Sequence, residues 1–246
     1  MASPVNFSMR HLVDGALRQL WPPTCIACGQ MGDAASGRDL CTPCHRALPW
    51  NRHACRRCAL PLPMTDADGL CGACQTASLG ALARVTASFA YAAPLDRLLP
   101  MFKFHQSMAA GRLLAGLMAD TLRDAASAAG GASLVPIPLH RRRLRQRGYD
   151  QALELARPLA QELGLSLGAG LLSRPKATGA QSRLGKAGRQ DNLMGAFRVN
   201  GHAPPPAHVI LIDDVMTTGA TLQSAATALR AAGVACVEAW VCARVA

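Results

Sequence analysis

The chain has 246 residues and a formal net charge of +11, and 50% of its residues are apolar whereas only 4% are aromatic. At about 100 to 200 residues per domain this length suits one domain and a half, and the apolar share excludes an intrinsically disordered chain. Residues 1–21 contain Arg10, Asp14 and Arg18 and lack the apolar run of a signal peptide, and glycines and prolines interrupt residues 125–140. We therefore expect a cytoplasmic protein without membrane insertion.

The positive charge is concentrated in one part of the chain. Residues 141–198 hold twelve basic and four acidic side chains, and five of these arginines lie between positions 141 and 147. Such a cluster favours a polyanion, either a phosphate-rich small molecule or a nucleic acid. A solvated basic face without a ligand would have the same composition, so charge alone does not choose between these interpretations.

Eight of the ten cysteines form an internal repeat with a period of 30 residues. Each copy has two CxxC pairs separated by twelve residues, a spacing that lets four thiolates surround one Zn²⁺ tetrahedrally. The predicted ligands are Cys25, Cys28, Cys41, Cys44, Cys55, Cys58, Cys71 and Cys74. Disulfides do not persist in a reducing cytosol, and a redox centre does not use four such pairs in register. We predict two structural zinc ions, because four thiolates leave no open position for catalysis.

The repeat leaves the ligand pairing open. The pairs could combine within each copy or interleave between copies, and His45 or His53 could complete a knuckle, although such histidines are more often ordinary surface residues. Cys236 and Cys242 lie outside the repeat in an apolar strand pattern, and we expect both to be buried packing residues.

From residue 84 onward short apolar strands alternate with amphipathic helices, which is typical of an α/β sheet. The pattern predicts strands at 84–92, 133–138, 208–212 and 234–245, and helices at 94–105, 107–126, 149–163 and 221–232, the third helix kinked at Pro158. We therefore expect an N-terminal helix and zinc module in residues 1–80, and a mostly parallel sheet flanked by helices in residues 81–246. Ligands of such sheets bind beyond the carboxyl ends of strands, which here are the loops after Ile137 and Ile212.

The most informative segment is 209–221, with the sequence VILIDDVMTTGAT. An apolar strand leads into Asp213 and Asp214, and a turn of small residues then begins a helix. The turn consists of Thr217, Thr218, Gly219, Ala220 and Thr221. Amides and hydroxyls at a helix start bind phosphate, whereas the carboxylates can accept hydrogen bonds from ribose hydroxyls and hold hydrated Mg²⁺. Since the chain has no GxxxxGK[ST] nucleotide loop, the segment predicts a site for 5-phosphoribosyl-1-pyrophosphate (PRPP).

This segment resembles the PRPP motif of type I phosphoribosyltransferases. Three further segments, and the zinc module, make the chain similar to the ComF family of competence-associated phosphoribosyltransferase-like proteins. The segments are LLPMFKFH at 98–105, VPIPLHRRRLRQRGYDQALELA at 135–156 and KATGAQSRLGKAGRQDNLMGAF at 176–197. The resemblance implies a type I phosphoribosyltransferase fold after a double zinc ribbon, PRPP and Mg²⁺ as ligands, and a link to DNA uptake and natural transformation. It also implies single-stranded DNA and DNA-processing proteins as partners.

The resemblance further implies roles for individual residues. A pyrophosphate loop opposite the acids would contain Pro138, Leu139, His140 and Arg141, and a mobile segment that closes over the ligand would contain Lys176, Thr178, Gln181, Arg189 and Asn192. Asp213 and Asp214 would hold the ribose, while Arg141 and Lys176 would stabilise the departing pyrophosphate together with Mg²⁺. Asp150 stands where the family commonly has asparagine.

Two classes of function follow, and we favour the first. An enzyme would transfer phosphoribosyl from PRPP to a nitrogen or other acceptor, but Thr217 stands where some purine-salvage relatives have an aspartate, and threonine cannot act as a general base at neutral pH. A binding protein would keep the fold without turnover, as PRPP-sensing regulators do. It would bind single-stranded DNA through the arginine run and the zinc module. No aromatic residue interleaves with that run, so the sequence does not indicate a base-stacking platform.

Overall fold

The computed structural model describes residues 24–32, 37–63, 69–76, 80–175, 195–201 and 204–246. Its centre is a five-stranded sheet with the order β1-β7-β6-β2-β3, in which all neighbouring strands are parallel, and β4 and β5 form a small antiparallel pair. The strands are β1 (Arg84–Ala90), β2 (Ser133–Pro136), β3 (Ser166–Leu167), β4 (Leu172–Ser173), β5 (Arg198–Val199), β6 (His208–Met216) and β7 (Cys236–Arg244). The predicted α/β class with a mostly parallel sheet is confirmed.

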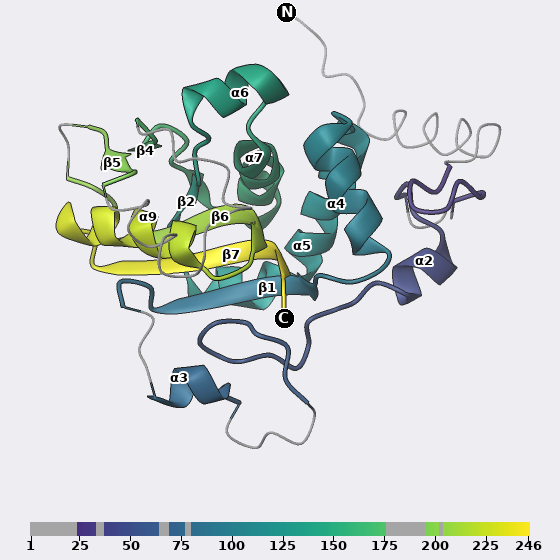
Figure 1. The fold of residues 1–246 in the computed structure, drawn as a ribbon, viewed down its shortest axis with the longest axis horizontal. Helices are drawn as coiled ribbons and strands as arrows, with labels where there is room; N and C mark the ends of the chain where they lie inside the picture. The colour runs from purple at the N-terminus through teal and green to yellow at the C-terminus, as the bar shows by residue number, and fades with distance from the viewer. Residues whose placement is uncertain (1–23, 33–36, 64–68, 77–79, 176–194, 202–203) are drawn as a thin grey trace, which may run out of the picture.

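Helices cover both faces of this sheet (Figure 1). They are α4 (Leu95–Phe104), α5 (Met108–Ala128), α6 (Arg141–Arg147), α7 (Gln151–Leu163) and α9 (Ala220–Ala231), and the cysteine-rich part adds α2 (Thr42–Arg46) and α3 (Gly72–Thr76). One apolar cluster joins α4, α5 and α7 to Ile210 and Trp240, and another joins α9 to Val209 and Val241. Successive residues of a strand point to opposite faces of the sheet, so β6 and β7 contribute side chains to both clusters and are buried on both faces. This burial explains why their sequences are nearly continuously apolar. In the described part of the chain no helix could cross a membrane.

The short strands β3, β4 and β5 were not predicted, and two elements near the candidate loops also differ from the predicted pattern. The arginine run forms α6, which begins where the His140 side chain accepts a hydrogen bond from the Arg142 amide and ends at Gly148 with φ 83°. β6 continues beyond Ile212 to Met216, because β7 pairs with it as far as Arg244. α7 contains Pro158, the residue at which the sequence predicts a kink, in its interior.

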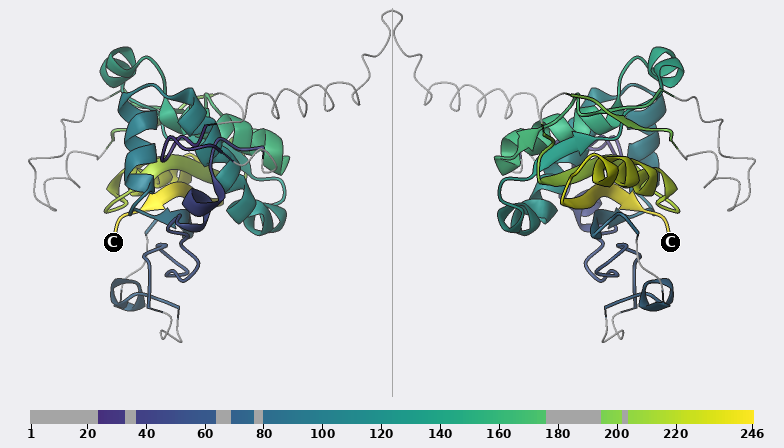
Figure 2. Two further views of the ribbon diagram at one scale, coloured as in Figure 1. Left: turned by 90° about the vertical axis from the view of Figure 1, so that its right-hand side faces the viewer. Right: turned by 90° about the vertical axis from the view of Figure 1, so that its left-hand side faces the viewer.

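The segment between the two cysteine clusters lies along the outer edge of β1. Trp50 forms an antiparallel bridge with Phe89, and their ring centroids are 4.8 Å apart. The Asn51 amide donates to the Ser88 carbonyl at 3.0 Å. Figure 2 shows the second cysteine segment, with α3, projecting beyond this edge of the sheet. The zinc module is therefore attached to the sheet by backbone hydrogen bonds as well as by side-chain packing.

Candidate functional site

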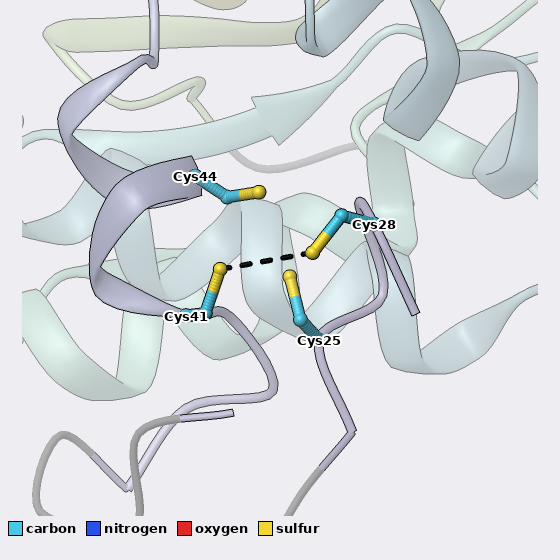
Figure 3. A group of neighbouring side chains, drawn as sticks. All are labelled: Cys25, Cys28, Cys41 and Cys44. Atoms are coloured by element: carbon cyan, nitrogen blue, oxygen red, sulfur yellow. Dashed lines mark hydrogen bonds between the residues drawn. The ribbon is translucent and has the colours of Figure 1, made fainter. Parts of the chain in front are cut away.

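Each copy of the cysteine repeat brings four thiols together. In both clusters the Sγ atoms lie within 4.8 Å of one another, with 3.7 Å between Cys28 and Cys41 and 3.6 Å between Cys58 and Cys71. Four thiolates at about 2.3 Å from one Zn²⁺ would be roughly 3.8 Å apart, so both clusters fit the ion. The four side chains of the first cluster point toward one another (Figure 3). The structure therefore groups the ligands within each copy, and two four-cysteine sites support structural zinc.

The environment of the thiols differs within each cluster in a repeated way. Burial raises the pKa of Cys25, but backbone hydrogen bonds, the strongest from Cys41, outweigh it and lower the pKa to about 6. Cys55, which holds the same position in the second copy, also has a pKa of about 6 for the same reasons. Burial and neighbouring thiols instead raise the pKa of Cys44 and Cys74. Since zinc binds thiolates, the low pKa of Cys25 and Cys55 favours the protonation state in which each can serve as a ligand.

The other candidate ligands lie elsewhere. The His45 ring packs edge-on against Trp50, with 5.3 Å between centroids, and His53 also lies outside the two four-cysteine groups. Cys242 is fully buried, as predicted. The expectation was wrong for Cys236, which is partly exposed because it begins β7 at the amino end of the sheet.

Asp213 and Asp214 lie near the carboxyl end of β6, inside the strand and not in the loop after it. Asp213 pairs in register with Val241 of β7, and its Oδ1 accepts a hydrogen bond from the Asp214 amide at 2.9 Å. Alternation along the strand directs Asp214 to the side of α4, where Lys103 Nζ lies 3.0 Å from its Oδ1. The two acids therefore present carboxylates on both sides of one strand end.

A third carboxylate, that of Asp150, lies close to this pair. Its Oδ2 accepts a hydrogen bond from the Leu139 amide at 2.9 Å, and its Oδ1 caps α7 at 3.3 Å. Burial raises the pKa of Asp150. Burial and the charge of Asp214 raise the pKa of Asp213 to about 8, although Lys103 opposes the shift. The three carboxylates repel one another, and a cation or a set of hydroxyl donors would relieve that repulsion.

The turn after β6 leads directly into α9. Gly219 caps this helix with φ 78°, a left-handed conformation that favours glycine, and a Cβ there would lie 2.6 Å from Met216 Cε. Thr217 and Thr218 are exposed, and Thr221 lies partly exposed in the first turn of the helix. The turn thus presents hydroxyls and the first amides of a helix, which are the usual donors to a phosphate group.

α6 and the end of α4 form a basic wall near the acids. Their side chains line a cavity of about 430 Å³. The lining residues are Lys103, Phe104, Gln106, Arg143, Gln146 and Arg147. Phe104 is 67% exposed, and the Arg147 guanidinium lies 5.4 Å from its ring centroid. An aromatic side chain therefore does meet the arginine run in space, although none interleaves with it in the sequence.

The remaining predicted phosphate contacts are placed as follows. Leu139 offers its amide to Asp150, His140 caps α6, and Arg141 is exposed in the first turn of that helix. Lys176 and Arg189 lie outside the described residues.

Known proteins match both halves of the chain. A family model of a double zinc ribbon domain matches residues 16–75, and a model of a phosphoribosyl transferase domain matches residues 150–246. The chain is 31% identical over 223 residues to the DNA utilization protein YhgH of Salmonella typhimurium, a match that covers 89% of this chain and 96% of the relative. It is 35% identical over 159 residues to competence protein F of Haemophilus influenzae, which covers 63% and 69% of the two chains. The chain belongs to the ComF family.

In this ComF-family protein the two domains meet at a residue that sequence analysis missed. Arg244, at the end of β7, donates from Nη1 to the Thr217 carbonyl at 2.5 Å and from Nε to the Cys58 carbonyl at 3.2 Å. It therefore ties the turn before α9 to the second zinc cluster. Lys103 was also missed as a site residue, although the segment around it carries the ComF resemblance. No local pattern identifies either residue, because their partners are distant in sequence.

Proposed function

We propose that this ComF-family protein binds PRPP together with Mg²⁺ at the carboxyl end of β6. One observation carries the proposal: Asp213 and Asp214 lie near the end of a central strand, and that strand leads into the turn that starts α9. The turn offers donors to the 5′-phosphate, and the carboxylates offer acceptors to the ribose hydroxyls. The arginines of α6 supply the positive charge that a pyrophosphate group requires.

The donor set also suits Mg²⁺, which prefers oxygen ligands and keeps several of its waters. Asp213 and Asp214 would hold the hydrated ion, which when bound neutralises charge on the pyrophosphate. Lys103, 3.0 Å from Asp214, fixes the orientation of that carboxylate and would turn its charge toward a phosphate oxygen once the ligand is present.

The reaction supported best is transfer of phosphoribosyl to a nitrogen or other acceptor, in a role linked to DNA uptake and natural transformation. The names of the relatives support that link. The acceptor forms a bond to ribose C1, pyrophosphate leaves with the electron pair of the broken C1–O bond, and the acceptor loses a proton. The Thr217 hydroxyl cannot take this proton at neutral pH, so the acceptor should already be nucleophilic or bring its own base.

Calorimetric titration with PRPP and Mg²⁺ tests the binding step. We expect the double substitution Asp213→Asn with Asp214→Asn to weaken PRPP binding at least tenfold, because asparagine keeps the shape but loses the charge. Asp124→Asn, on the exposed face of α5, is the matched control and should bind normally. Equal binding by the wild type and the double variant, or no binding by the wild type, contradicts the proposal.

Turnover needs its own experiment. Incubation with PRPP, Mg²⁺ and a pool of nucleobases and amines should release pyrophosphate when a suitable acceptor is present. Release should disappear in the double aspartate variant. PRPP binding without release for any acceptor would favour a PRPP-responsive binding protein.

A second candidate function is the binding of single-stranded DNA. The observation that favours it is the exposed Phe104 ring against Arg147, since an aromatic face beside guanidinium groups can stack a base and contact its phosphates. Binding of an oligonucleotide should weaken steeply with salt, and Phe104→Leu should weaken it by about 1–3 kcal/mol. A flat salt dependence would rule out contacts made by the arginines.

A further inference from the structure

A cluster of possible metal ligands lies at the opposite end of the sheet from the PRPP site. His208 is the first residue of β6. Cys236 and Glu238 are the first and third residues of the neighbouring strand β7. The parallel register sets His208 beside Cys236, and Glu238 follows two residues later. Because alternate residues of a strand point to the same face, the three side chains share one face of the sheet.

The distances in this cluster suit a shared ion better than direct hydrogen bonds. The His208 nitrogen, the Cys236 sulfur and a Glu238 oxygen lie within 4.8 Å of one another. The distance from His208 Nε2 to Glu238 Oε1 is 3.8 Å, which is too long for a hydrogen bond. Nitrogen and oxygen ligands at about 2.0–2.1 Å from one Zn²⁺ would be roughly 3.4 Å apart. Small side-chain rotations would therefore bring the three atoms around one ion.

The imidazole of His208 gives independent support. Its Nε2 atom is buried and has no hydrogen-bond partner among the described residues, although buried polar atoms in folded proteins are almost always paired. This same nitrogen faces Glu238 Oε1. A metal ion between the two atoms would satisfy both.

The surroundings hold the carboxylate in a suitable orientation. Arg84, beside Glu238 on β1, donates from Nη2 to Oε2 at 3.0 Å and leaves Oε1 for His208. Carboxylates that bind metals are commonly fixed by such an outer hydrogen bond. All three candidate ligands come from strands in the interior of the sheet, and all are partly exposed, so an ion could enter from solvent.

We propose that His208, Cys236 and Glu238 form a metal site separate from the two zinc clusters and from the Mg²⁺ site, for a borderline divalent cation such as Zn²⁺ or Co²⁺. Imidazole and thiolate ligands favour these ions over Mg²⁺, so the site differs in selectivity from the acids at the other end of the sheet. Three protein ligands leave one coordination position open to water or to a ligand from another molecule. This site is independent of PRPP binding.

Metal titration of the full chain tests the proposal. Protein carrying two zinc ions per chain is titrated with Co²⁺, and absorption from thiolate-to-cobalt charge transfer is recorded. We expect one further equivalent to bind, and Cys236→Ser and His208→Gln each to weaken that binding at least tenfold. Cys242→Ala, a cysteine on the same strand and fully buried, is the control and should bind like the wild type. The proposal is overturned if the wild type with two zinc ions binds no Co²⁺, or if both ligand variants bind Co²⁺ as tightly as the wild type.

A measurement on the unsubstituted chain covers the case in which these variants do not fold. Zn²⁺ should slow alkylation of Cys236 by iodoacetamide at least tenfold, as measured by mass spectrometry of the peptide. Cys242 should stay unreactive with or without the ion, because it is fully buried. Unchanged alkylation of Cys236 overturns the proposal.

Discussion

The two zinc clusters have the same spacing in sequence but different surroundings in the structure. Cys25 and Cys41 of the first cluster are buried in the apolar cluster that also contains Phe102 of α4 and Leu117 of α5. The four cysteines of the second form a separate small cluster with Leu60, Leu62 and Leu70. The second cluster is connected to the turn before α9 through Arg244. The two copies of the motif therefore differ in their surroundings: the first copy is part of the main core, and the second contacts the turn before α9 through Arg244.

Removal of the first zinc should have the largest effect. Cys44→Ser should lower the free energy of unfolding of the main domain by several kcal/mol, since zinc binding contributes about 10 kcal/mol or more to isolated zinc modules. Urea unfolding followed by circular dichroism measures the loss. Cys74→Ser, the matched change in the second cluster, should cost the main domain about 1 kcal/mol or less. Equal losses in the two variants would break the distinction between the clusters.

The second zinc should matter more for the ligand than for the fold. Cys74→Ser should weaken PRPP binding about tenfold, which corresponds to about 1.4 kcal/mol, because the second cluster carries the Cys58 carbonyl that receives Arg244. Calorimetry at saturating Mg²⁺ measures this change. Unchanged affinity with one zinc ion lost would show that the cluster does not support the turn.

Arg244 provides a smaller and more direct test of the same connection. Arg244→Gln should weaken PRPP binding about fivefold, because glutamine cannot reach both the Thr217 and Cys58 carbonyls. Both zinc ions should remain bound. The control is Arg230→Gln, since Arg230 also donates to a backbone carbonyl, that of Val234 at 2.9 Å, but at the end of α9. Similar losses in the two variants would argue against a specific role of Arg244.

The pH dependence of PRPP binding distinguishes the charge of Asp213 from the support that the second zinc cluster gives to the turn before α9. The pKa of Asp213 is raised to about 8, so a rise in pH from 6 to 8 takes this carboxyl from almost fully protonated to about half deprotonated and should strengthen binding of Mg²⁺ and PRPP, by at most about tenfold per pH unit. The gain should level off above pH 8. Asp213→Asn should remove this dependence, whereas Cys74→Ser should lower the whole curve without moving its midpoint. A shifted midpoint in Cys74→Ser would mean that the second cluster acts on the charge of the acids.

The features that could be predicted from sequence are those specified by neighbouring residues. The cysteine repeat and the segment from Asp213 to Thr221 combine ligand chemistry with a fixed local spacing. The sequence analysis did not predict α6, although arginine has a high helix propensity and Gly148 is a typical helix stop signal. It interpreted the arginine run only as a concentration of positive charge. The extension of β6 and the pairing of Lys103 with Asp214 depend on partners brought by the fold. No local pattern contains that information.

The strand pairing around Trp50 has a consequence for the solubility of the metal-free protein. β1 is the outermost strand of the main sheet, and an uncovered edge strand can pair with the same edge of another molecule. Trp50 and Asn51 occupy that edge through Phe89 and Ser88, and the segment that carries them is anchored by a zinc cluster on either side. Loss of zinc would release the segment and uncover the edge. We therefore expect the metal-free protein to be more prone to edge-to-edge aggregation than the zinc-loaded one.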